Sequence, residues 1–372
     1  MINTSRPPAA STDFDGTRLT VARRLRGMTK TALANQVGVT PTAIAHYEKG
    51  GRPTQAMLAG LCLALGLPRE FFGAGRPIDL LPASSAHFRS LRSTSAASRE
   101  QALAFGELGL ELVSLIDQHV DLPATNLPDI TVPEQIEAHH IEQAVAELKL
   151  TWAIPAGPIG SVVQLLEANG IITMRLPEGT DPKVDAFSTY AGQRPLVLLS
   201  PRTGDKARGR FDAAHELGHL ILHPDTEPGS KIVENQAHSF AAEFLMPREE
   251  IIDQLPRRID WPHLHELKRH WGVSLRALVY RSKALGVLSD ASYRRANQQL
   301  SQWGFPEPGP LGPPESPRLL GMVRDLMLDS GVDFEGILSS GRIVSDVADQ
   351  IIAAATDPRP RIEIGLGSVP RD

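Results

Sequence analysis

The pattern of polar and apolar positions over the first 70 residues predicts a set of short helices. Apolar residues recur every three or four positions, the interval that places side chains on one face of an α-helix. Four helices are predicted, at 17–26, 30–37, 41–49 and 55–65. Gly38 permits a sharp turn before the third helix, which Thr40 can cap and which has Pro41 in its first turn. The pattern therefore predicts a helix-turn-helix unit.

The rest of the chain combines longer helical patterns with three short strand patterns. Helical spacing continues over 98–119, 133–150 and 159–169. Short β-branched and apolar runs then predict strands at 171–176, 186–191 and 195–199. Helical patterns return at 205–223, 231–244, 262–271, 275–285, 318–330 and 344–355. The predicted fold is multidomain and mainly α with a small β-sheet, an all-α helix-turn-helix domain being followed by an α+β domain.

Composition shifts divide the chain into six segments. A chain of 372 residues is longer than the chains that usually fold around a single hydrophobic core. Stretches rich in Ser, Thr, Pro and Gly, without periodicity, predict a tail and two linkers. The predicted segments are a disordered tail 1–14, the helix-turn-helix domain 15–73, a linker 74–96, a second domain 97–304, a Pro/Gly linker 305–317 and a C-terminal helical appendage 318–372.

The net charge of −5 conceals an asymmetry between the two ends of the chain. Between Phe14 and Gly73, eight Lys/Arg stand against three Asp/Glu, a local charge of +5 that leaves −10 for the remainder. Only the N-terminal part therefore suits a polyanion. The single cysteine, Cys62, lies in an apolar run, which predicts core packing in a reducing compartment. The sequence has neither a secretory leader nor an uninterrupted apolar run of about 18 residues, so we expect a cytoplasmic protein without a membrane partner.

The segment from Thr31 to Gly50, TALANQVGVTPTAIAHYEKG, resembles the Cro/C1-type (XRE-like) helix-turn-helix family of phage repressors. The resemblance rests on the glycine turn, the Tyr-Glu-Lys-Gly exit and the apolar helix that follows. It implies that 41–49 is the recognition helix and that the partner is a double-stranded DNA operator, bound as a homodimer on paired half-sites. The alternative is a dimerisation or protein-binding module that does not contact DNA.

Two groups of residues in this unit are expected to contact DNA. The first group faces base edges and consists of Thr40, Thr42, Ala43 and His46. The second group contacts phosphates and consists of Arg18, Arg23, Lys30, Lys49 and Arg52.

A candidate metal site lies at His215-Glu216-Leu217-Gly218-His219, inside a helical pattern. Two histidines four residues apart share one helix face and can bind one Zn²⁺ at about 2.0–2.1 Å, leaving room for a third ligand and a water. Glu216 would then act as the base that takes a proton from water. The next helical pattern carries Glu234, which is the expected third ligand, and Glu243, which is the alternative.

The segment FDAAHELGHLILH, from Phe211 to His223, occurs together with E-x-x-A-x-x-F-A-x-x-F-L-M-P, from Glu234 to Pro247. This combination resembles the ImmA/IrrE family of metallopeptidases. The resemblance implies a zincin-like, thermolysin-like minimal metallopeptidase domain with one zinc ion, and cleavage of a transcriptional repressor. It assigns His215, His219 and Glu234 as ligands and Glu216 as the base.

Several residues near the motif have two interpretations. His238 stands where such families often have Asn, and is either a residue that supports the ligands or an adventitious ligand. His223 ends the helix and orients or shields the site, with a ligand role as the alternative. Tyr190 is expected to be a packed aromatic side chain rather than an oxyanion donor. The strand that contains it has an edge that can hold an extended substrate.

A second helix–Gly-Val-Ser–helix pattern covers 264–280. It allows a second DNA-binding motif, but the apolar residues predict a helical pair packed on the peptidase core. These residues are Trp271, Leu275, Leu278 and Tyr280.

Two functions fit these features. The first is a zinc endopeptidase guided by its own DNA-binding domain, which cleaves a repressor or itself. The alternative is a non-proteolytic transcription factor in which the peptidase-like domain senses a ligand, an arrangement that fusion to a DNA-binding domain favours. An antitoxin-like autorepressor is a third possibility.

Overall fold

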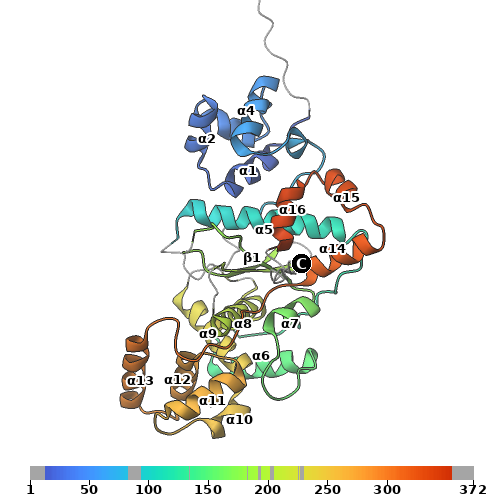
Figure 1. Ribbon diagram of the computed structural model, residues 1–372. Helices are drawn as coiled ribbons and strands as arrows, with labels where there is room; N and C mark the ends of the chain where they lie inside the picture. Colours follow the sequence, from blue (N-terminus) through green and yellow to red (C-terminus); the bar gives the residue numbers. More distant parts are fainter. Residues whose placement is uncertain are drawn as a thin grey trace, which may run out of the picture.

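The computed structural model describes residues 13–82, 94–133, 135–181, 183–191, 194–201, 205–224, 226 and 230–353. Most of the predicted tail 1–14, the middle of the predicted linker 74–96 and the end of the predicted appendage lie outside these residues. Within the described residues the chain is mainly helical and contains a three-stranded sheet (Figure 1), as the sequence predicts. None of the described helices combines the length and apolarity needed to cross a membrane.

The N-terminal helices form where the pattern places them. They are α1 (Gly16–Leu25), α2 (Lys30–Val37), α3 (Pro41–Glu48) and α4 (Gln55–Leu65). Thr40 accepts a hydrogen bond from the backbone N–H of Ala43 and so caps α3. Gly38 ends α2 in the left-handed region, at φ 73°, where a side chain is strained. The short helix η1 (Arg69–Phe72) completes this part of the core with two buried phenylalanines.

Helix α5 (Ala96–Ile116) lies between the helix-turn-helix helices and the sheet (Figure 1). Gly109 allows α5 to approach the sheet closely, because a Cβ there would overlap the Met174 side chain. Arg24 of α1 forms a buried ion pair of 2.8 Å with Glu107 of α5. Burial raises the pKa of Glu107 above its ordinary value, and the charge of Arg24 acts in the opposite direction. α5 therefore joins the helix-turn-helix part to the rest of the protein through both apolar and charged contacts.

The sheet has the strand order β1-β3-β2. β1 (Ile172–Arg175) runs parallel to β3 (Arg194–Leu199), and β2 (Phe187–Ala191) runs antiparallel to it. Alternate residues of β3 enter different cores: Leu196 and Leu198 belong to the core shared with α5, whereas Val197 and Leu199 belong to the second core. The sheet thus separates the two cores, and β2 occupies one of its edges.

The second core is built from helices on the other face of the sheet. Its helices are α6 (Ala138–Thr151), α7 (Val162–Ala168), α8 (Lys206–Leu222), α9 (Lys231–Leu245), α11 (Trp261–Trp271) and α12 (Leu275–Ala284), with the short α10 (Arg248–Ile251) and η2 (Ile252–Gln254) between α9 and α11. Trp271, Leu275 and Leu278 are buried in this core. The helical pair α11–α12 therefore packs on the second core, in agreement with the preferred interpretation of 264–280.

Among the described helices, three α-helices were not predicted from the sequence. They are the four-residue α10, α13 (Asp290–Trp303) and α15 (Phe334–Ser340). In α13, Tyr293, Ala296, Leu300 and Trp303 recur at helical spacing and pack on the second core, a signal that the sequence analysis missed. α15 is only seven residues long, which gives its periodicity little room to appear.

The segment 305–317, predicted as a Pro/Gly linker, is held at two glutamates; we call it the connecting segment. Glu307 pairs with the buried Lys268 at 2.7 Å and accepts the backbone N–H of Leu275. Glu315 pairs with the buried Arg210 of α8 and accepts the backbone N–H groups at the start of α7. Glycine and proline indicate the absence of helix here, but buried ion pairs fix the path of the chain.

The C-terminal helices were predicted as a separate appendage, but they pack in the same core as α5. They are α14 (Leu319–Asp329), α15 and α16 (Ser345–Ala353), and their buried residues share the core of α1 and α5. Glu167, at the end of α7, accepts the backbone N–H groups of Arg318 and Leu319 and so anchors the start of α14. Burial raises the pKa of Glu167 to about 7.

The side chain of Arg18 connects the first helix to this C-terminal part. It is 0% exposed, and its guanidinium donates hydrogen bonds of 2.8–3.2 Å to the backbone oxygens of Phe71, Arg76, Gly341 and Arg342. Arg23 is also buried and pairs with Glu48 at 2.5 Å. The prediction that Arg18 and Arg23 contact phosphates is therefore wrong, because neither guanidinium reaches the surface.

Candidate metal centre and helix-turn-helix surface

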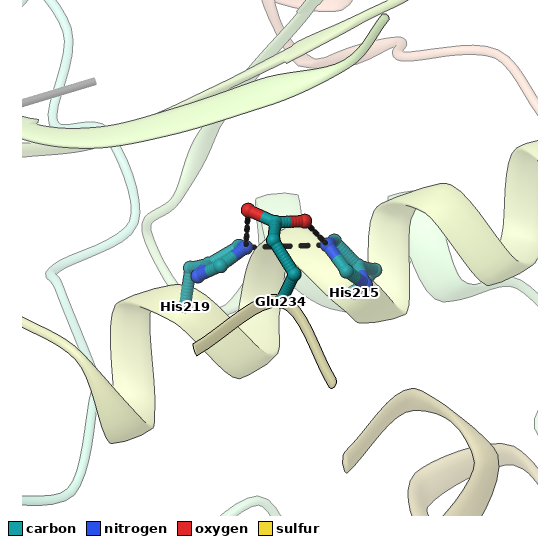
Figure 2. Close-up of side chains that lie close together, drawn as sticks. All are labelled: His215, His219 and Glu234. Carbon is teal, nitrogen blue, oxygen red and sulfur yellow. Dashed lines mark hydrogen bonds and ion pairs between the residues drawn. The ribbon is translucent and has the colours of Figure 1, made fainter. Parts of the chain in front are cut away.

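The two motif histidines lie side by side on the inner face of α8. His215 and His219 are each 1% exposed, and their Nε2 atoms are 3.2 Å apart (Figure 2). The neighbouring positions Ala213, Ala214 and Leu217 are buried in the second core, which fixes the helix on the sheet. The four-residue spacing thus produces the shared face that the sequence predicts.

Helix α9 brings Glu234 to the same point. Its carboxylate oxygens lie 3.4 Å from Nε2 of His215 and 3.6 Å from Nε2 of His219 (Figure 2). α9 can approach α8 because position 218 is glycine: a Cβ there would lie 3.0–3.1 Å from atoms of Phe240 on α9. Close packing of the two helices therefore brings Glu234 within reach of both histidines.

The three side chains are close enough to share one metal ion. Ligand atoms at about 2.0–2.1 Å from a zinc ion, in tetrahedral directions, lie about 3.3 Å from one another. The histidine nitrogens are 3.2 Å apart, one Glu234 oxygen lies 3.4 Å from His215 and the other lies 3.6 Å from His219. With one ligand atom taken from each residue, the three atoms lie within 4.8 Å of one another. Both Glu234 oxygens are buried without a hydrogen-bond donor among the described residues, which is costly for a carboxylate unless a cation is present. These three residues fit a zinc ion by their chemistry and by their spacing.

Glu216 follows the first histidine and points towards the sheet. Its Oε2 accepts a hydrogen bond of 2.7 Å from the hydroxyl of Ser188 on β2, and both side chains are at most 1% exposed. Sequence reasoning did not single out Ser188. The only available signal was a hydroxyl residue in a predicted strand, and such residues are common at surfaces.

The alternative ligands are engaged elsewhere. Glu243 forms a buried ion pair with Arg281 and accepts the backbone N–H of Arg248, and it is not part of the cluster of His215, His219 and Glu234. His223 lies 2.9 Å from the side-chain oxygen of Gln236. His238 packs its ring between Phe211 and Tyr280, with centroid distances of 4.7 and 4.8 Å.

Tyr190 is 48% exposed on β2, so the expectation of a packed aromatic side chain is wrong. The three residues before it on this edge strand, Phe187, Ser188 and Thr189, are all nearly inaccessible, so burial along β2 ends before Tyr190.

Most residues expected to contact DNA are at the surface. The exposed ones are Lys30, Thr40, Thr42, His46, Lys49 and Arg52. Ala43 is half-buried, since it follows the cap of α3 and faces partly inwards. Lys30 pairs with Glu48 at 3.0 Å, and Glu48 also pairs with Arg23 of α1. The C-terminal end of α3 is therefore linked to α1 by an ion pair.

Comparison with known protein families agrees with both parts of this structure. Residues 167–283 match the family model described as the IrrE N-terminal-like domain, a segment that contains β1 to β3, α8 to α11 and all of α12 except its last residue. Residues 21–72 match the family model described as helix-turn-helix. No curated protein matches the chain. The chain thus carries an N-terminal Cro/C1-type helix-turn-helix domain and a peptidase-like domain of the IrrE/ImmA family.

Proposed function

We propose that this protein is a DNA-binding transcriptional regulator whose zinc-dependent endopeptidase domain cleaves a repressor protein or itself. The observation that carries the proposal is the convergence of His215, His219 and Glu234, with Glu216 next to them on α8. The alternative of a non-proteolytic, ligand-sensing transcription factor keeps the same site but needs no role for Glu216.

In this proposal His215, His219 and Glu234 hold one zinc ion. The ion supplies a Lewis acid that polarises the carbonyl of the bond to be cleaved. The residue that moves protons is Glu216, which accepts one from the attacking water at its carboxylate and returns it to the leaving amine. The Ser188 hydroxyl, 2.7 Å from Oε2, fixes the orientation of this carboxylate.

In this proposal the helix-turn-helix domain brings the protein to its DNA operator. We propose that α3 lies in the major groove of a double-stranded operator, with Thr40, Thr42, Ala43 and His46 towards the bases. Lys30, Lys49 and Arg52 would contact phosphates, and two copies of the chain would bind paired half-sites as a homodimer in the cytoplasm. The exposure of six of these seven residues supports the proposal.

Elemental analysis of the purified protein tests the ligand set. We expect one zinc per chain in the wild type and much less in His215→Ala and Glu234→Ala. Glu249→Ala is the matched control, because Glu249 is exposed on α10. Zinc retained in Glu234→Ala and lost in Glu243→Gln would show that the carboxylate assignment is wrong.

A Glu216→Gln variant tests proteolysis. The amide has the shape of the carboxylate but cannot take a proton, so we expect proteolysis to fall by about 10²–10⁴-fold while zinc and DNA binding remain. Transcript profiles of cells carrying the wild type, Glu216→Gln or no copy give the readout. A Glu216→Gln profile equal to that of the wild type would reject the peptidase role and favour the ligand-sensing alternative.

A further inference from the structure

A pocket of about 940 Å³ opens beside the candidate metal centre. Its walls come from α8, α9, α12, α13 and the connecting segment. The volume is in the range of binding pockets for peptides and small molecules, and is several times that of one side chain. It is therefore large enough for a short stretch of polypeptide.

The pocket continues the surface on which the proposed zinc ligands stand. Arg208, Asp212, His215 and His219 follow one another at intervals of three or four residues and so share one face of α8. The first two line the pocket and the last two belong to the metal centre.

Helix α9 repeats this arrangement. Glu234 and His238 are four residues apart, and His238 lines the pocket. The ring centroids of His215 and His238 are 6.5 Å apart. An extended chain advances by about 3.3–3.6 Å per residue, so a polypeptide at the metal centre reaches the pocket within about two residues.

The lining is rich in aromatic rings. Phe211, Tyr280 and Tyr293 contribute theirs beside His238, and His238 already packs edge to face against Tyr280 at 4.8 Å. Aromatic side chains favour such edge-to-face and offset partners over other groups of similar size. A wall of this kind prefers an aromatic or large apolar guest.

Five of the six charged side chains of the lining are engaged with other charged groups or with backbone, and the sixth, Arg276, has its guanidinium 3.5 Å from the side-chain oxygen of Asn297. Arg208 pairs with Asp185 at 3.3 Å and with Asp212 at 3.4 Å. Glu307 pairs with Lys268, and Asp205 accepts the backbone N–H of Ala207 at the start of α8. A charged guest would have to compete with these interactions, which again favours an uncharged one.

The geometry points to this pocket as the site that selects the substrate: it takes a segment with an aromatic side chain within two residues of the cleaved bond. This inference rests on the proposed endopeptidase function. It assigns Tyr280 and Tyr293 as specificity-determining residues, and it defines the substrate class as polypeptides with an aromatic residue beside the scissile bond.

Cleavage-site profiling with a mixture of synthetic peptides, read by mass spectrometry, tests the inference. We expect one position within two residues of the cut to be enriched in Phe, Tyr or Trp. Tyr293→Ala should reduce that preference by about fivefold, since one aromatic contact is lost. Tyr293→Phe is the matched control and should retain the preference, because the ring remains. α13 carries none of the proposed zinc ligands, so Tyr293 variants should keep their zinc.

Two results would overturn the inference. One is cleavage without an aromatic preference, and the other is a preference that survives in both Tyr280→Ala and Tyr293→Ala. If the wild type cleaves no peptide, the proposed function fails, and the pocket is tested by binding alone. Zinc-loaded Glu216→Gln should then bind a Phe-containing pentapeptide more tightly than its Ala counterpart in fluorescence polarisation, and equal affinities would reject the pocket assignment.

Discussion

Replacing Arg18 with methionine distinguishes a structural role for this residue from a role in DNA binding. The sequence predicts a phosphate contact, whereas the structure places the guanidinium on four backbone oxygens from two distant parts of the chain. Methionine keeps much of the apolar stem and removes the charge and all donors. Burial lowers the pKa of Arg18, while the nearby Glu111, 3.7 Å away, acts to raise it.

The expected loss of stability follows from the groups left behind. A hydrogen bond to a charged group contributes about 1.5–3 kcal/mol, but four carbonyls sharing one guanidinium do not add independently. Removing the guanidinium leaves several buried carbonyl oxygens without a donor, at about 1–3 kcal/mol for each group that stays unsatisfied. We therefore expect about 3–5 kcal/mol of local destabilisation in Arg18→Met.

Hydrogen exchange measured by mass spectrometry is the suitable assay, because a multidomain chain does not unfold in one step. Protection of the amides in α1 should fall by at least about 100-fold, the equivalent of about 3 kcal/mol. Arg52→Met is the control: Arg52 is exposed, so exchange should be unchanged. Normal protection in Arg18→Met, with weaker binding to a mixed-sequence duplex, would refute the reasoning and restore the phosphate contact.

Three further predictions concern other parts of the molecule. Because the pKa of Glu167 rises from 4.5 to about 7 on folding, the protonated carboxyl contributes to the free energy of unfolding. That contribution is fully present below pH 4.5 and is lost as the pH rises through about 7. Hydrogen exchange of the α14 amides, corrected for the intrinsic exchange rate at each pH, should show a loss of about 3 kcal/mol between pH 5 and 8 in the wild type but not in Glu167→Gln. Gly218→Ala should weaken zinc binding by about tenfold, because its Cβ meets Phe240 and displaces the helix that carries Glu234; unchanged affinity in a zinc titration would contradict this. Lys49→Met should reduce the slope of the logarithm of DNA affinity against the logarithm of salt concentration by about one phosphate contact, and should weaken binding to all DNA sequences equally. An unaltered slope would exclude that contact.

The candidate site was predictable from sequence to the extent that it depends on spacing within one helix. His215 and His219 share a face because α-helical geometry repeats every 3.6 residues, and the four helices of the first domain follow from the same periodicity with Gly38 and Thr40 as end signals. Spacing within one helix does not select the carboxylate, since Glu234 and Glu243 both lie on the next helix. Its position depends on how α9 packs on α8, and Arg281 removes Glu243 from the competition.

The sequence by itself thus determined the helix-turn-helix unit, the histidine pair and the mainly helical fold, because each is encoded by residues within a few turns of one another. Tertiary structure alone decided that Arg18 is an internal tie, that Ser188 orients Glu216, and that Glu315 anchors the connecting segment to α8. These contacts join residues separated by as many as 324 positions, and no local periodicity records them. Burial then decides the role of each charge, since a guanidinium without water must find its acceptors in the protein.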